Sequence, residues 1–159
     1  MEVVIIRPPL VYGPGVKANF RGLMRWLERG VPLPLGAINN RRSLVGRDNL
    51  IDLIALCLQH EKAAGQTFLV SDGEDVSTTQ LLRKMQCALG SQSFLLPIPS
   101  AILSAGASLL GKGAVARRVL GSLQVDISHT QDTIGWVPPI SLDTGLRLTA
   151  AEFKAQISP

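Results

Sequence analysis

The sequence predicts an α/β fold in which strands and helices alternate in the first half of the chain and helices dominate the second. Residues 3–6 are a β-branched run without polar alternation, which is typical of a parallel strand covered on both faces. Residues 67–70 form a second apolar run, and beyond Ser77 apolar side chains recur at helical spacing. A chain of 159 residues can bury roughly 68–70% of its unfolded surface, so one self-sufficient domain is expected.

After the strand at residues 3–6, two prolines interrupt regular pairing because Pro has no amide hydrogen to donate. Residues 8–15 are therefore expected to form a rigid loop at the carboxyl end of that strand, where open α/β sheets bind ligands. Apolar residues at helical spacing predict a helix over residues 18–29, and Gly30 is expected to end it.

The sequence of the middle of the chain predicts one extended segment, two strands and one helix. Residues 31–36 are apolar but rich in proline and are expected to be extended, with a short strand over residues 41–45. Asp48 is expected to cap a helix over residues 50–58, which is apolar on most faces and should be buried. Residues 67–70 form the next strand.

Each helix of the second half is expected to begin at a serine cap. Ser77 and Gln80 have the spacing of a capping box, and Gly90 should end this helix. The other expected starts are Ser100, Ser128 with Gln131 for a short helix that ends at Gly135, and Ser141 for a last helix through Phe153. The Gly/Ser-containing stretch 106–113 is the candidate weak point between two parts.

Composition excludes several classes of protein. Hydrophobic residues make up 46% and charged residues 18% of the chain, which excludes a disordered chain. The net charge of +4 suits anionic small molecules as well as nucleic acid, but the aromatic residues are not interleaved with Lys and Arg as in a base-stacking platform. We therefore expect no nucleic-acid partner.

The sequence also lacks targeting and membrane signals. The N-terminus has neither a basic segment ahead of an apolar one nor a small-residue cleavage site, so it is not a signal peptide. The most apolar stretch, residues 94–110, is interrupted by prolines and serines and is shorter than the ~20 residues of a spanning helix. A soluble, cytoplasmic protein with no membrane partner is expected. Cys57 and Cys87 are too isolated for a disulfide or zinc site and are expected to be buried thiols.

Residues 13–18 formally match the G-x-G-x-x-G/A dinucleotide fingerprint, and we reject the match. Pro8 and Pro9 separate the glycines from the strand, Pro14 removes an amide donor, and the expected acidic residue about 20 positions later is missing. No nucleophile–base set can be assembled from the spacing, so no catalytic residue is predicted.

Anion-binding side chains are easier to find than metal ligands. Arg41, Arg42 and Arg47 cluster in one segment, where they are either surface residues of an edge strand or bidentate ligands of a diphosphate. His60 and His129 have no second ligand at metal spacing, so we expect no metal site and a solvated or capping role for both.

Three motifs together resemble the C-terminal half of the extended short-chain dehydrogenases/reductases, the NAD-dependent nucleotide-sugar epimerases and dehydratases. They occur in the family's order: Ile6–Gly15 (IRPPLVYGPG), Arg42–Val45 leading into Asp48–Leu50, and Ile134–Pro139 (IGWVPP) followed by Ser141-Leu142 and Gly145-Leu146. Within the family, the chain resembles the UDP-glucose 4-epimerase or 4-keto-sugar reductase branch.

The resemblance implies a domain organisation. It implies a single unit over residues 1–159 that is the C-terminal part of a larger two-lobe protein. Residues 1–75 would hold the late strands of a Rossmann-type sheet and a nucleotide-binding segment. Residues 76–159 would form a mainly helical substrate lobe.

The resemblance also assigns ligand-binding positions. Pro8, Pro9, Leu10 and Val11 would line the nicotinamide end of NAD. Asn19 and Phe20 would touch the sugar diphosphate, Leu33 and Leu35 would carry the uracil base, Arg42 would bind the diphosphate, and Arg118 or its neighbour Arg117 would be a second arginine from the C-terminal lobe.

The family's catalytic groups have no counterpart here. In the family, a tyrosine of a Tyr-x-x-x-Lys pair acts as acid/base while hydride passes between sugar C4 and NAD. Tyr12 is the single tyrosine of this chain, and position 16 is Val. The resemblance therefore implies a substrate-binding portion without catalytic activity of its own; the alternative is a stand-alone interaction or regulatory module that binds a protein or an anion. Late strands without their upstream neighbours would have unpaired edges, which predicts a homodimer or swapped oligomer.

Overall fold

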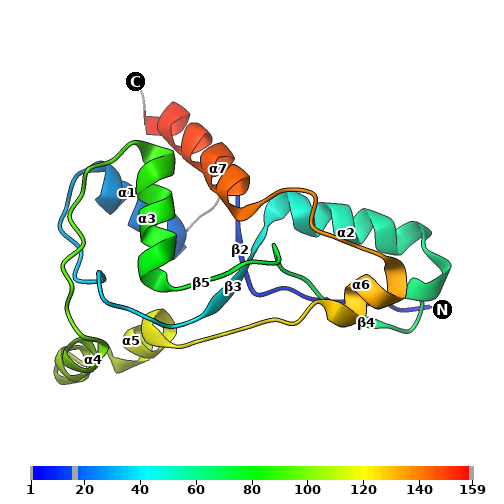
Figure 1. The fold of residues 1–159 in the computed structure, drawn as a ribbon, viewed down its shortest axis with the longest axis horizontal. Helices are drawn as coiled ribbons and strands as arrows, with labels where there is room; N and C mark the ends of the chain where they lie inside the picture. Colours follow the sequence, from blue (N-terminus) through cyan, green and yellow to red (C-terminus); the bar gives the residue numbers. More distant parts are fainter. Residues whose placement is uncertain (1, 16–17, 158–159) are drawn as a thin grey trace.

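The computed structural model describes residues 2–15 and 18–157 of the chain and confirms the predicted α/β class (Figure 1). Its strands are β1 (Ile5–Arg7), β2 (Leu10–Tyr12), β3 (Arg42–Gly46), β4 (Thr67–Leu69) and β5 (Asp75–Val76). Its helices are α1 (Ala18–Glu28), α2 (Arg47–Gln59), the 3₁₀ turn η1 (Glu61–Ala63), α3 (Thr78–Leu89), α4 (Ser100–Leu109), α5 (Gly113–Leu120), α6 (Ser128–Ile134) and α7 (Leu142–Ile157).

The strands form two small sheets. β1 pairs in parallel with β4, as expected for two apolar runs without alternation. β2 pairs in parallel with β3, and β3 pairs antiparallel with β5. The prediction of a loop throughout residues 8–15 is wrong, because the chain regains amide donors after Pro9 and residues 10–12 use them to pair with β3.

Two apolar clusters fill the interior, and β3 contributes to both. Leu44 packs in a cluster formed mainly by α1, α3 and α7, whereas Val45 packs in a cluster formed by β1, β4, α2 and α6. Successive side chains of a strand point to opposite faces, so one strand can serve two cores. In Figure 1 the first cluster lies near the C-terminus and the second lies near the N-terminus, with β2 and β3 between them.

The local signals at helix ends are largely confirmed. The Ser77–Gln80 capping box is present, and Gly90 and Gly135 adopt the left-handed conformation directly after α3 and α6. The Ser141 hydroxyl accepts the Thr144 amide at the start of α7.

The structure differs at other helix starts. Ser128 does not cap α6 with its own side chain, because the Asp126 carboxylate accepts the Ser128 amide and hydroxyl. These hydrogen bonds lower the pKa of Asp126. α5 was not predicted; it begins where the small residues of 106–113 end.

Three predictions about burial and capping near α2 and α3 are wrong. Asp48 does not cap α2, which begins one residue earlier with no side-chain cap. α2 is not buried on most faces, since Leu58 is 82% exposed and the helix packs through one face only. Cys57 is buried as expected, and burial raises its pKa, but Cys87 is exposed because it lies on the outer face of α3.

Candidate functional site

A buried hydrogen-bond network joins the three family-like motifs. The Tyr12 hydroxyl donates to Asp72 Oδ2 at 2.6 Å. Asp72 Oδ1 accepts the Gly46 amide at 2.8 Å and Asn49 Nδ2 at 2.7 Å. Asn49 also donates to the Ile140 carbonyl and accepts the Ile140 amide, so the network reaches the segment before α7.

The network fixes the fold and does not supply acid/base chemistry. Burial, followed by the hydrogen bond to Asp72 and its negative charge, raises the pKa of Tyr12 above its usual value. The hydroxyl proton is held by the Asp72 carboxylate, and the raised pKa keeps the phenol in its neutral form. The Tyr12 side chain therefore links the end of β2 to Asp72.

The first turn of α3 gathers the segments that the sequence analysis assigned to substrate. Thr79 Oγ1 accepts the Ile38 amide at 2.9 Å and donates to the Leu35 carbonyl at 2.6 Å. Thr78 donates its amide to Asn40 Oδ1 and its hydroxyl to the Val119 carbonyl, at 2.8 and 2.9 Å. The extended segment before β3 and the end of α5 are thus held to one helix start.

Asn40 completes this junction between α5 and β3. Its Nδ2 donates to the carbonyls of Val119 and Gly121 at 3.1 and 2.8 Å. Asn40 is buried, and so are Thr78 and Thr79. We call these three residues the Asn40 junction; it holds two segments about eighty residues apart in one fixed arrangement.

Arg42 lies two residues after Asn40 and is the first residue of β3. Its backbone is held between β5, where it pairs with Val76, and the chain after α5, where it forms a bridge with Leu123. The side chain is half-buried, and burial lowers its pKa, although an arginine remains charged at neutral pH. A partly desolvated guanidinium on a rigid strand is well suited to bind a diphosphate.

The structure places the other expected substrate residues as follows. Leu33 is buried and Leu35 is partly buried, and the Leu33 backbone exchanges hydrogen bonds with Phe94 and Leu96. The Phe20 side chain lies in the core and stacks on Tyr12 with ring centroids 5.7 Å apart. A ligand could therefore meet Leu33 and Phe20 only through their backbone or through a rearrangement of the core.

The two remaining substrate candidates are described only in part. Asn19 lies in the first turn of α1, but its side chain lies outside the described residues. Arg118 lies in α5, and its side chain is also outside them. Arg117 is exposed on the same helix, four residues before Gly121, where the Asn40 junction holds the chain.

The expected cofactor segment lies at the carboxyl end of β1. Pro8 and Leu10 are exposed, and Pro9 and Val11 are partly buried. These four side chains are apolar and offer no side-chain donor to a phosphate. Among the described residues there is no cluster of metal-ligating side chains, and His60 accepts the Lys62 amide at the start of η1, the capping role expected of it.

Comparisons with known proteins define the family. No family model matches the chain. A UDP-glucose 4-epimerase from Vibrio cholerae is 53% identical over 154 residues, which are 96% of this chain and 47% of that protein. The chain thus spans about half the length of the curated relatives it matches.

Solved structures of epimerases have the same fold as this chain. The UDP-glucose 4-epimerase of Thermotoga maritima with UDP-glucose has a TM-score of 0.68 at 22% identity and covers 96% of this chain and 46% of that chain. The UDP-glucuronic acid 4-epimerase of Bacillus cereus, in complex with UDP-glucuronic acid and NAD, has a TM-score of 0.71 at 19% identity, covering 98% and 46%. At these identities the likeness establishes the fold alone.

The 53% identical relative and the shared fold identify the class of protein that the chain resembles, the extended short-chain dehydrogenases/reductases. Within that class the likeness is to part of a nucleotide-sugar epimerase, and the predicted resemblance is confirmed.

Proposed function

We propose that this chain is the substrate-binding portion of a nucleotide-sugar epimerase, and that it binds a UDP-sugar around the Asn40 junction. The observation that carries the proposal is the placement of half-buried Arg42 two residues after Asn40, where the Asn40 junction also holds the end of α5. The Vibrio cholerae relative is named a UDP-glucose 4-epimerase, which favours a UDP-hexose as the substrate class.

The complete reaction needs groups that this chain does not contain. Hydride transfer at sugar C4 requires NAD and an acid/base residue, and NAD is the cofactor we propose for the complete enzyme, with residues 8–11 beside its nicotinamide. We therefore expect no epimerisation by the 159-residue chain alone, and we place the activity of the complete enzyme in the cytoplasm.

Calorimetric titration with UDP, UDP-glucose and NAD tests the proposal. The chain should bind UDP and UDP-glucose, and Arg42→Ala should weaken both by about 1.5–3 kcal/mol because a charge-assisted hydrogen bond is lost. Arg83→Ala is the matched control, since it removes the same charge from an exposed position on α3. Absence of UDP binding by the wild type, or equal affinity of the two variants, would show that the site is elsewhere.

We also propose that the chain associates with itself through the sheet formed by β1 and β4. Ile5 and Leu69 lie on the same face of this sheet and are 45% and 36% exposed, while the other face carries the buried Phe68. Parallel sheets are normally covered on both faces, and β1 pairs with no described strand except β4. The same bare face would serve the second candidate function, a module that binds another protein.

Light scattering measures this association directly. The wild type should have about twice the monomer mass of 17.0 kDa, and Ile5→Lys should return it toward the monomer. Ile51→Lys, at an exposed position on α2, is the control and should leave the mass unchanged. A wild-type monomer would refute self-association.

A further inference from the structure

Helix α4 is apolar but has no buried residue. Its sequence, Ser-Ala-Ile-Leu-Ser-Ala-Gly-Ala-Ser-Leu, is the pattern of a helix that packs inside a protein, yet every one of its residues is at least partly exposed. Ile102 is 62% exposed, and Leu109 and Leu110 at its end are 89% and 76% exposed. Its contacts are chiefly with α5, so the rest of the chain does not cover it.

The stretch of sequence around α4 carries positive charge and no negative charge. Residues 76–125 contain no Asp and no Glu. Lys112 lies in the turn between α4 and α5, and Arg117 is exposed on α5. The sequence places one more cationic residue, Arg118, in α5. We call residues 100–120 the α4–α5 hairpin.

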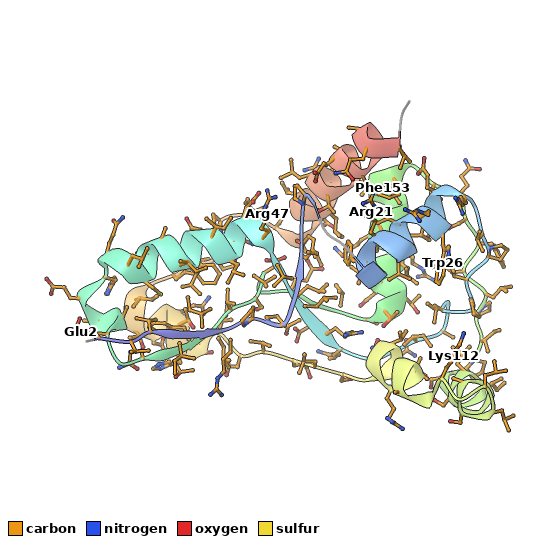
Figure 2. All side chains as sticks on the ribbon, turned by 180° about the vertical axis from the view of Figure 1, so that it is seen from behind. Glu2, Arg21, Trp26, Arg47, Lys112 and Phe153 are labelled. Carbon is orange, nitrogen blue, oxygen red and sulfur yellow. The ribbon has the colours of Figure 1, made fainter. Side chains whose placement is uncertain are left out.

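The hairpin occupies a corner of the molecule. Figure 1 shows α4 and α5 together at the lower left, away from α2, α6 and β4. Figure 2 shows Lys112 at this corner from the opposite side. A surface that approaches this corner would meet the exposed apolar side chains and the cations together.

We propose that the α4–α5 hairpin is a peripheral docking site for an anionic lipid surface. Aliphatic side chains of a short helix enter the boundary between headgroups and acyl chains, while nearby Lys and Arg bind lipid phosphates. The charge argues for this occupant, because a 50-residue segment with no acidic side chain complements a uniformly negative surface. The exposed apolar residues are aliphatic and offer no hydrogen-bonding group for a specific protein partner.

This inference concerns docking on a membrane and not insertion through one. The expectation of no membrane partner rested on the lack of a spanning segment, and no helix in the described part of the chain is long and apolar enough to cross a bilayer. α4 has 10 residues, about half the length a spanning helix needs. A peripheral helix has no such length requirement.

Co-sedimentation with lipid vesicles tests the proposal on the complete 159-residue chain. Wild-type protein should bind vesicles of phosphatidylcholine mixed with phosphatidylglycerol at least about tenfold better than phosphatidylcholine alone, because each cation near the surface contributes about fivefold. High salt should remove most of that preference.

Two pairs of neutral substitutions separate the apolar and the charged contribution. Leu109→Ser with Leu110→Ser should lower binding to both kinds of vesicle by about tenfold or more, since two leucines no longer enter the lipid. Lys112→Gln with Arg117→Gln should remove the preference for the anionic vesicles and leave the residual binding to neutral ones.

Matched control pairs use equally exposed positions elsewhere. Ile51→Ser with Leu58→Ser on α2, and Arg25→Gln with Arg83→Gln, should bind vesicles like the wild type. Circular dichroism verifies the fold of every variant, and the high exposure of the substituted side chains favours folding.

The proposal is overturned if the wild type binds neither vesicle, if the hairpin variants bind like the wild type, or if the control pairs lose binding equally. It is also overturned if light scattering shows an oligomer that the Leu109→Ser and Leu110→Ser pair dissociates, because the hairpin would then bind a second copy of the chain.

Discussion

Tyr12→Phe and Gly145→Ala, singly and together, test how the end of β2 is locked against α7. The Tyr12 hydroxyl lies between Asp72, to which it donates at 2.6 Å, and the backbone of Gly145. A Cβ added at Gly145 would overlap this hydroxyl, and it would lie 3.0 Å from the nearest ring carbons. The phenol group thus both makes a hydrogen bond and requires a glycine opposite it.

The structure gives the size of each effect. Tyr12→Phe keeps the ring and its stacking on Phe20 but removes one hydrogen bond to a buried carboxylate, which should cost about 2 kcal/mol. Asp72 keeps the Gly46 amide and Asn49 as donors, so the loss stays moderate. Gly145→Ala should cost about 2 kcal/mol through overpacking.

The double variant distinguishes this mechanism from two independent defects. Removing the Tyr12 hydroxyl frees part of the space that the methyl group of Gly145→Ala needs. The unfolding free energy of the double variant should therefore fall by about 3 kcal/mol instead of the additive value of about 4. Urea unfolding followed by circular dichroism measures all four proteins. A double variant that loses the full sum or more would refute the steric coupling, and a Tyr12→Phe variant as stable as the wild type would refute the role of the hydrogen bond.

Two further predictions concern α3, its ion pairs and its N-terminal cap. The Lys84 ammonium lies 2.8 Å from Asp143 and 3.0 Å from Glu74, and these contacts, with the Asp143 hydrogen bond the largest, raise the pKa of Lys84 above its usual 10.5. Because the folded-state pKa is raised, the stabilisation is present below pH 10.5 and is lost as pH rises through the folded value. The melting temperatures of wild type and Lys84→Met should therefore differ at pH 8 and converge as the pH is raised beyond the folded-state pKa, which lies above 10.5; a constant difference would contradict the ion-pair origin. Ser77→Ala should lower the unfolding free energy by about 1 kcal/mol by removing the capping box of α3, and Ser128→Ala, at a helix start without a side-chain cap of its own, should cost less; equal losses would contradict the capping mechanism.

Features encoded within one turn of chain could be predicted from the sequence. The capping box at Ser77 and the left-handed Gly90 depend on residues three to five positions apart, and both are confirmed. The strand over residues 10–12 was missed because its partner is β3, far along the chain, and two prolines masked the pairing. The exposure of Cys87 and of α2 was missed because helical periodicity shows which face is apolar but not whether another element covers it.

The residues of the candidate site likewise include one that the sequence predicted and three that it did not. The arginine cluster in the sequence indicated Arg42 as a candidate ligand of a diphosphate, and the family resemblance supported that assignment. The role of Arg42 in substrate binding stays a prediction, which the calorimetric titration tests. Asn40, Thr78 and Thr79 were missed as site residues, because their hydrogen bonds reach segments about 40 to 80 residues away and Asn and Thr are common in loops. The one sequence signal that could have indicated Asn40 was its position directly before the arginine cluster.

Most residues of the motifs that carried the family resemblance make contacts that stabilise the fold, and fewer of them are placed to bind a ligand. Tyr12, Asn49 and Gly145 come from three separate motifs, yet the structure packs all three around Asp72: Tyr12 and Asn49 donate to its carboxylate, and Gly145 lies against the Tyr12 hydroxyl. Arg42 belongs to one of these motifs as well, but it is exposed enough to meet a ligand. Replacing Asn49 should therefore lower stability and nucleotide-sugar binding together, because its loss frees the segment before α7, whereas Arg42→Ala should lower nucleotide-sugar binding in a chain that still folds. Asn49 and Arg42 belong to the same motif, but this comparison assigns Asn49 to maintaining the fold and Arg42 to contacting the substrate.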